Sequence, residues 1–222
     1  MDFATLQRLF ESLDTSSCCD ADKGLRVVDP AIRPLQPAPR LLGFARTVVC
    51  RGDFLPVLHS LAGSLAGDVL VVDAGGATAA VAGELFATEA QRRGLGGLVV
   101  DGAVRDTGTL RTLGIAIYAR HVSPMAGGNR SAAEPAGQVS CGGVTVRPGD
   151  VLFGDADGVV VVAPGDVERL TARAAEIQRV EAQVLARLRS GTSLADLTNI
   201  AEHWDLRLRG EESALRFTLP PH

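Results

Sequence analysis

The chain has 222 residues, of which 46% are hydrophobic, 22% charged and only 4% aromatic, and its formal net charge is −4. This length suits one domain with or without tails, and the composition is that of a globular protein with a core of Val, Leu, Ile and Ala. The sequence has no basic stripe, no uninterrupted apolar run at the N-terminus and no apolar segment near about 18 residues, so we expect no nucleic-acid binding, secretory signal or membrane span.

The first fifty residues are predicted to begin with a helix and to end with a strand. Apolar residues recur at helical spacing over residues 3–13, which predicts an amphipathic helix. A short apolar run covers residues 25–28. Four prolines within residues 30–39 indicate a loop or an extended linker, and residues 43–50 have the pattern of a strand.

The middle of the chain alternates between helical and strand patterns. The apolar run of residues 68–73 is typical of a strand that is buried on both faces, and residues 98–101 share this pattern. The expected helices cover residues 53–66, 85–93 and 106–113, and the expected strands cover residues 68–73, 78–82, 98–101 and 115–119.

The last hundred residues are predicted to contain a surface loop at 122–140 and a long helix at about 167–189, which begins after Pro164-Gly165-Asp166. The alternation of elements predicts an α/β fold. We expect one domain over residues 1–195 and a C-terminal extension over residues 196–222. Three short strands are expected between the loop and the long helix, at residues 144–147, 150–153 and 159–162.

Cysteines and lysines limit the chemistry that is open to this chain. Cys18, Cys19, Cys50 and Cys141 form no C-x-x-C pair, so we expect reduced thiols in a cytoplasmic protein, with a zinc site or a redox pair as the alternative. Lys23 is the single lysine among 22 basic residues. A Schiff-base mechanism would therefore need Lys23, which two nearby aspartates tend to keep protonated, or the N-terminus.

The four histidines, His59, His121, His203 and His222, are scattered and lack the spacing of zinc ligands. His121 and Ser123 follow a predicted strand, and a plain loop role is favoured for them over contact with a substrate.

The segment of residues 83–106 is the most informative part of the chain. It contains a predicted strand, a glycine turn and then Arg105-Asp106 at the start of a predicted helix. Residues at the carboxyl ends of strands commonly line the binding crevice of α/β proteins. Taken alone, the Arg-Asp pair would be interpreted as a surface ion pair with a helix-capping aspartate.

The surroundings of this pair favour a site. Glu84 lies at the start of the preceding helix, where unpaired N–H groups suit a carboxylate. If Glu84 and Asp106 converge, they offer hard oxygen ligands for Mg²⁺ or Mn²⁺. Arg105 would supply a permanent cation for a substrate carboxylate or for an enolate oxygen.

Glu84, twenty intervening residues and then Arg105-Asp106 resemble the acidic-X20-Arg-Asp motif of the 4-hydroxy-4-methyl-2-oxoglutarate / 4-carboxy-4-hydroxy-2-oxoadipate aldolases. These are class II pyruvate aldolases that share a fold with the regulator of ribonuclease E activity A (RraA-like) proteins. The resemblance covers roughly residues 15–190. It continues through the glycine-containing segments at 72–76, 100–102, 141–144, 148–150 and 154–159.

The resemblance implies a role for each site residue. Asp106 would coordinate the metal directly, and Glu84 would hold a metal-bound water. Arg105 would bind the pyruvoyl oxygen and stabilise the enolate. The backbone amides of Leu85 and Phe86 would hold the substrate carboxylate. The characterised aldolases carry Asp where this chain has Glu84, and its longer side chain would shift that water.

A neighbouring subunit is also expected to place an acidic residue near the site. Glu181, on the predicted C-terminal helix, is the candidate, and a solvated helix face is the alternative interpretation of this residue. The tail of residues 201–222 has no counterpart in the family pattern.

The resemblance further implies a three-layer β/β/α swivelling-type domain that forms a homotrimer or a dimer of trimers. The expected reaction is cleavage of a 4-hydroxy-2-oxo acid, or decarboxylation of oxaloacetate, to pyruvate with Mg²⁺ or Mn²⁺. The expected partner is thus a small 2-oxo acid. The alternative is a non-catalytic binding protein of the ribonuclease-regulator type. A methyltransferase, a label that some relatives carry, finds no glycine-rich nucleoside-binding loop here.

Overall fold

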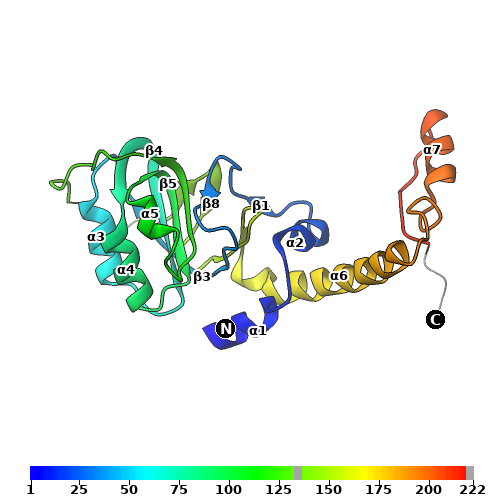
Figure 1. The fold of residues 1–222 in the computed structure, drawn as a ribbon, viewed down its shortest axis with the longest axis horizontal. Helices are drawn as coiled ribbons and strands as arrows, with labels where there is room; N and C mark the ends of the chain where they lie inside the picture. Colours follow the sequence, from blue (N-terminus) through cyan, green and yellow to red (C-terminus); the bar gives the residue numbers. More distant parts are fainter. Residues whose placement is uncertain (133–136, 219–222) are drawn as a thin grey trace.

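The computed structural model describes residues 1–132 and 137–218, so His222 and part of the predicted loop at 122–140 lie outside the described residues. The body of the molecule is built around an eight-stranded sheet in the order β1-β10-β9-β3-β4-β5-β6-β2 (Figure 1). β3, β4, β5 and β6 are parallel, and the other pairs are antiparallel. In sheet order the strands are Arg26–Val27, Val159–Val162, Val151–Gly154, Leu41–Val49, Asp68–Ala82, Gly97–Val104, Ile117–Val122 and Arg33–Pro34.

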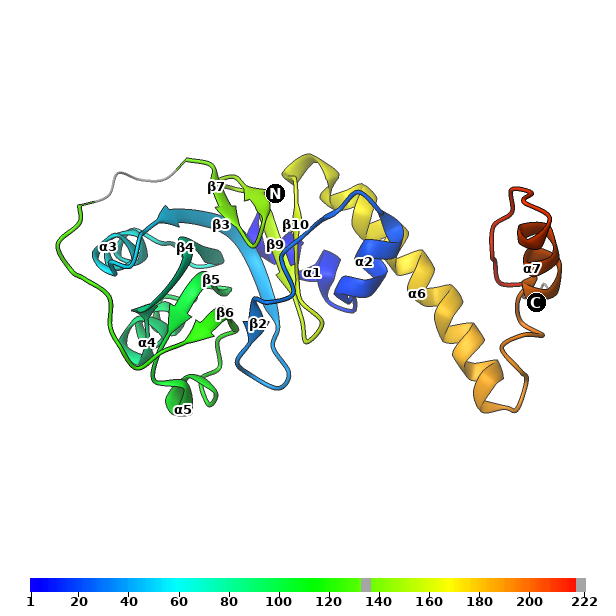
Figure 2. The same cartoon turned by 90° about the horizontal axis from the view of Figure 1, so that it is seen from above.

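The sheet is the middle layer of three. Helices α3 (Leu55–Ala62) and α4 (Glu84–Arg92) cover one face, and the hairpin of β7 (Val139–Cys141) and β8 (Val144–Val146) packs on the other (Figure 2). The predicted α/β fold with β/β/α layers is therefore confirmed.

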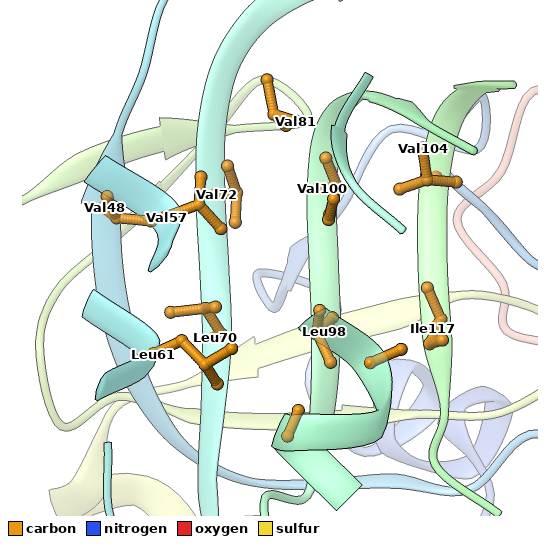
Figure 3. Packing of buried hydrophobic residues seen from close by; sticks show 14 of the residues in the cluster. Val48, Val57, Leu61, Leu70, Val72, Val81, Leu98, Val100, Val104 and Ile117 are labelled. Atoms are coloured by element: carbon orange, nitrogen blue, oxygen red, sulfur yellow. The ribbon is translucent and has the colours of Figure 1, made fainter. Parts of the chain in front are cut away.

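Alternating side chains of β4 explain why both faces are covered. Leu70 and Val72 pack against the helices, while Val69 and Val71 pack towards the hairpin. Successive side chains of a strand point to opposite faces, so an unbroken apolar run requires cover on both. Figure 3 shows Leu70 and Val72 facing the α3 residue Leu61 and its neighbours.

A second helical group lies at the β1-β10-β9 side of the sheet. Helices α1 (Phe3–Phe10), α2 (Thr15–Ala21) and α6 (Val167–Arg189) share a core with β9 and β10. In this core the rings of Phe10 and Phe153 are 4.8 Å apart between centroids. The 3-10 turn η1 (Pro164–Asp166) precedes α6, which begins at Val167 as predicted for the long helix.

Helix α6 continues beyond the body, and α7 (Ile200–Leu208) lies past its far end (Figures 1 and 2). The structure describes every residue of α7, and none of them is buried. The domain boundary expected after residue 195 stays a prediction.

Within residues 1–132 and 137–218, no helix combines the length and the apolar character that crossing a membrane requires.

The structure corrects the prediction of two strands at residues 68–73 and 78–82, because β4 is a single strand, Asp68–Ala82. Its register with β5 shifts between Asp73 and Ala77, where Gly75 and Gly76 have φ values of 61° and 73°. Glycine adopts such angles without steric cost, so the strand bulges here rather than ending.

Three predicted helices are shorter than expected. The first ends at Phe10 rather than at residue 13, and α3 ends at Ala62 rather than at residue 66. After α3, the Leu65 amide donates to the Asp68 side chain at 2.8 Å, which forms the turn into β4. Asp106, expected to open a helix at 106–113, stays outside α5 (Thr107–Leu110).

Replacing Leu70 by Ala should lower the free energy of unfolding by roughly 2–5 kcal/mol, because this side chain is 0% exposed between β4 and the helices. Leu65→Ala is the matched control, since Leu65 is 72% exposed, and it should change stability by less than about 0.5 kcal/mol. Urea unfolding followed by circular dichroism measures both, and equal costs would contradict the layer assignment.

Candidate active site

The carboxyl ends of β4 and β5 bring the two halves of the predicted motif together. Ala82, the last residue of β4, pairs with Val104, the last residue of β5. The Arg105 amide then donates to the Ala82 carbonyl at 3.1 Å, which extends this pairing by one residue. Gly83 and the start of α4 therefore lie beside Arg105 and Asp106.

Asp106 has an unusual backbone conformation. With φ 58° and ψ 35°, it is the only non-glycine residue with positive φ in the described part of the chain. A left-handed conformation costs an L-residue roughly 1–2 kcal/mol, although aspartate tolerates it better than most. Residues with such a strained backbone cluster at functional sites.

The Asp106 side chain caps a helix, but not the helix that follows it. It makes no capping hydrogen bond to α5. Its Oδ2 instead accepts from the Glu84 amide, the first N–H of α4, at 3.1 Å. The simple interpretation of Asp106 as a cap for its own helix is therefore wrong. Its carboxylate sits at the positive end of α4, where a negative charge is favoured.

Gly83 leaves the space for this arrangement. A Cβ at this position would lie 2.5 Å from Asp106 Oδ2 and 2.9 Å from Arg105 Cγ. The backbone of Gly83 is extended, with φ −165° and ψ −158°, so the need for glycine comes from close approach and not from the backbone angles.

Arg105 and Asp106 form an open pair at a cavity. Arg105 Nε is 3.5 Å from Asp106 Oδ2, and the two side chains are 43% and 38% exposed. Both residues line a cavity of about 280 Å³. In the part of the chain that the structure describes, the Arg105 guanidinium has no other polar contact, so most of its N–H donors have no protein partner.

The other predicted residues fall into two groups. Glu84 is exposed and Leu85 is 78% exposed, both in the first turn of α4, and Leu85 and Phe86 line the cavity. The first amides of a helix have no partner inside it, so this turn presents N–H donors. Glu181 lies on α6, and α4 lies on the opposite side of the body (Figure 1). Within one chain, Glu181 is therefore not brought to the cavity.

The donor set fits a hard cation that keeps much of its water. No three His, Cys, Asp or Glu side chains gather around one point within the described residues, so these residues form no site in which protein ligands replace all the water of a metal ion. Asp106 and Glu84 each carry a carboxylate, and the Asp106 carboxylate accepts from the Glu84 amide at 3.1 Å. Mg²⁺ is commonly held by one or two carboxylates and several waters, and Mn²⁺ takes similar ligands.

Sequence reasoning missed the apolar side of the cavity. Phe54, Leu58 and Leu61 from the α3 region line it opposite α4. The Phe54 and Phe86 rings meet edge to face with centroids 6.0 Å apart. The helical spacing of residues 54, 58 and 61 was the available signal, but such spacing also describes an ordinary core face.

Two other polar residues at strand ends or bulges do not line this cavity. Asp73 is bound by Arg51 at 2.8 Å and by the Gly75 amide at 3.1 Å, so its carboxylate serves the β4 bulge. His121 is exposed at the end of β6 and is not among the described residues that line the cavity.

The four cysteines carry free thiols. Burial raises the pKa of Cys18 to about 12 and that of Cys50 to about 11, and it also raises the pKa of Cys141. These three thiols are therefore protonated near neutral pH and are poor nucleophiles.

The fold and the strand-end site define an RraA-like protein. The RraA-like family model, Aldolase/RraA, matches residues 15–161, and the chain belongs to this family. A similar relative from Halalkalibacterium halodurans is named "Putative 4-hydroxy-4-methyl-2-oxoglutarate aldolase". It is 38% identical over 171 residues, which are 76% of this chain and 81% of the relative.

Two solved structures have the same fold. An uncharacterized protein from Pseudomonas syringae pv. tomato has a TM-score of 0.78 and 26% identity, over 87% of this chain and 92% of that chain. The RNA-processing inhibitor RraA from Thermus thermophilis has a TM-score of 0.63 and 31% identity, over 67% of this chain and 92% of that chain.

Gly83→Ala should destabilise the protein by roughly 1–3 kcal/mol, because its methyl group overlaps Asp106 Oδ2. The amide resonance of Glu84 should shift as its hydrogen bond lengthens. Gly108→Ala is the control, since a Cβ there meets nothing within 4 Å on the helix α5. This change should leave stability equal or raise it by up to about 1 kcal/mol. Thermal unfolding and ¹H–¹⁵N spectra of both variants test this prediction. Unchanged stability of the Gly83→Ala variant would contradict the close approach of Asp106 to Gly83.

Proposed function

We propose that this protein is a divalent-metal-dependent lyase, a class II pyruvate aldolase. Its substrates are 4-hydroxy-2-oxo acids of the 4-hydroxy-4-methyl-2-oxoglutarate type, and it also decarboxylates oxaloacetate. The observation that carries the proposal is the Asp106 carboxylate, held at 3.1 Å by the Glu84 amide beside the open Arg105 guanidinium. The name of the Halalkalibacterium halodurans relative supports the same reaction.

The two carboxylates have separate tasks in this proposal. Asp106 would hold Mg²⁺ or Mn²⁺ directly, because its position at the strand end is fixed by the pairing of β4 with β5. Glu84, exposed in the first turn of α4, would hold the ion through water. The bound ion supplies positive charge that stabilises the oxygen of the pyruvate enolate.

Arg105 and the helix amides hold the 2-oxo acid end of the substrate. The amides of Leu85 and Phe86, at the N-terminus of α4, suit the substrate carboxylate. Arg105 lies beside them, and its planar fork donates to the C2 oxygen. As the C3–C4 bond breaks, negative charge grows on this oxygen, and a preplaced cation stabilises that charge more than it stabilises the ground state.

One site serves both reactions because both leave the same enolate. Retro-aldol cleavage and decarboxylation of oxaloacetate each deliver the electron pair of a carbon–carbon bond into pyruvate. A Schiff base at the single lysine is unsupported. Lys23 is 77% exposed, pairs with Asp20 and does not line the cavity.

We further propose a homotrimer or a dimer of trimers, in which Glu181 of one subunit approaches the site of the next. α6 extends away from the body of its own subunit, which supports a contact in trans (Figure 1). Light scattering tests the assembly, and Glu181→Gln tests the residue.

A binding protein of the ribonuclease-regulator type is the second candidate, because the fold is shared with the RNA-processing inhibitor RraA. Absence of Mg²⁺ and Mn²⁺ binding, together with a specific ribonuclease complex on size-exclusion chromatography, would favour it over the lyase.

Arg105→Ala should lower kcat for pyruvate release at least about 100-fold, the usual cost of removing one preplaced donor to a developing oxyanion. Asp106→Asn should abolish metal-dependent turnover while keeping the fold, because asparagine tolerates the left-handed backbone and still accepts from the Glu84 amide.

The control is Arg179→Ala, which removes an arginine of an exposed ion pair with Glu176 on α6. Pyruvate release is measured with Mg²⁺ against oxaloacetate and a panel of 4-hydroxy-2-oxo acids. Wild-type rates in both site variants would rule out the proposal.

A further inference from the structure

We infer that the preferred substrate carries an apolar group at C4, where 4-hydroxy-4-methyl-2-oxoglutarate carries its second carboxylate. The inference rests on the proposed lyase function and names the substrate class of the same site. It comes from the cavity that adjoins Arg105 and Asp106, not from the carboxylates themselves.

The cavity is lined mainly by hydrocarbon. It lies between the α3 region and the first turns of α4, and its volume of about 280 Å³ suits a small molecule. Leu61 is completely buried at its floor, and Leu58 is 45% exposed at its mouth. The apolar residues that form most of the wall are Phe54, Leu58, Leu61, Val81, Phe86 and Ala126.

Within residues 1–132 and 137–218, no free cation lines this wall. Arg105 is the only basic residue among the described residues that line the cavity, and the proposed mechanism uses it at the C2 oxygen. Glu89 also lines the cavity, and it is held by Arg92 and Arg93, each at 2.7 Å. A substrate carboxylate placed beyond C4, against this wall, would thus lose water and gain no free cationic partner among the described residues that line the cavity.

For an alkyl or aryl group, the free energy of transfer from water into the cavity has the opposite sign. Its transfer from water to the walls formed by Phe54, Leu58 and Phe86 is favourable, because apolar surface leaves water on both sides of the contact. Such a pocket discriminates between hydrocarbon and carboxylate more strongly than between hydrocarbons of similar size.

The reaction balances without another reactant. The C3–C4 bond breaks and its electron pair passes to the enolate of pyruvate. The C4 hydroxyl gives its proton to water and becomes the carbonyl of an apolar aldehyde or ketone, while C3 of the enolate takes up one proton from water. The products are pyruvate and that carbonyl compound, and nothing is oxidised or reduced.

A matched pair of substrates tests the inference. 4-Hydroxy-4-methyl-2-oxopentanoate differs from 4-hydroxy-4-methyl-2-oxoglutarate only by a methyl group in place of the distal carboxylate. With the Mg²⁺-loaded wild-type enzyme, kcat/KM should be at least about 10-fold higher for the apolar member. Equal or better cleavage of the dicarboxylate would overturn this inference and leave the lyase proposal standing. No cleavage of either compound would overturn both.

Binding of unreactive analogues gives a second readout. Neither 4-methyl-2-oxopentanoate nor 2-oxoglutarate has the C4 hydroxyl that cleavage requires. Calorimetry with the Mg²⁺-loaded protein should give a Kd at least about 10-fold lower for 4-methyl-2-oxopentanoate. A lower Kd for 2-oxoglutarate would contradict the inference.

A substitution at the mouth of the cavity should change this preference. Leu58→Arg places a cation beside the distal group and should raise the relative kcat/KM for the dicarboxylate by about 10-fold or more, which is the scale of one well-placed charged partner. Leu65→Arg is the matched control, because Leu65 is 72% exposed and does not line the cavity. An unchanged preference in Leu58→Arg, with calorimetry confirming bound Mg²⁺, would place the distal group elsewhere and overturn the inference.

Discussion

One hydrogen bond, from the Glu84 amide to the Asp106 carboxylate, joins the two strand ends on which the candidate site depends. It draws on three local features: the left-handed backbone of Asp106, the missing side chain at Gly83 and the unpaired first N–H of α4. Without it, the carboxylate would be free to rotate, and Arg105 would lose the partner that lies 3.5 Å from its Nε. The strain at Asp106 and the charge at the helix end offset each other.

The same helix end carries structural and chemical tasks. The N-terminus of α4 stabilises the Asp106 carboxylate, and its next two amides are those proposed to hold the substrate. This overlap accounts for a nine-residue helix that begins with no capping side chain of its own. The cap comes from the following strand–helix turn, so helix, metal ligand and substrate donors are aligned by the pairing of two neighbouring strands.

Much of the fold could be predicted from local patterns. The apolar runs ending at Asp73 and Asp101 identified central strands, and the helix that follows residues 164–166 was placed within a residue or two of α6. The continuity of β4 could not be predicted, because Gly75 and Gly76 mark a break and a bulge equally well.

The site divides in the same way. The motif drew attention to Glu84, Arg105 and Asp106, yet no sequence rule says that an aspartate will cap the helix before it rather than the helix after it. That outcome depends on the register of β4 against β5, which is set by tertiary structure. The apolar wall from α3 could not be predicted for a similar reason. The helical spacing of its apolar residues does not show whether they pack against another helix or line a cavity.

The position of the site beside the central strands affects the order in which parts of the molecule unfold. Glu84 and the two amides lie within the strand–helix–strand unit β4-α4-β5, and Arg105 and Asp106 directly follow its second strand, β5, which is buried along its whole length. Amide protons in such a central unit exchange with solvent mainly when the whole domain unfolds, whereas frayed outer helices exchange by local opening. The reactive end of the protein is therefore also one of its last parts to melt, and heat or mild denaturant would loosen α7 while the strand ends keep their geometry.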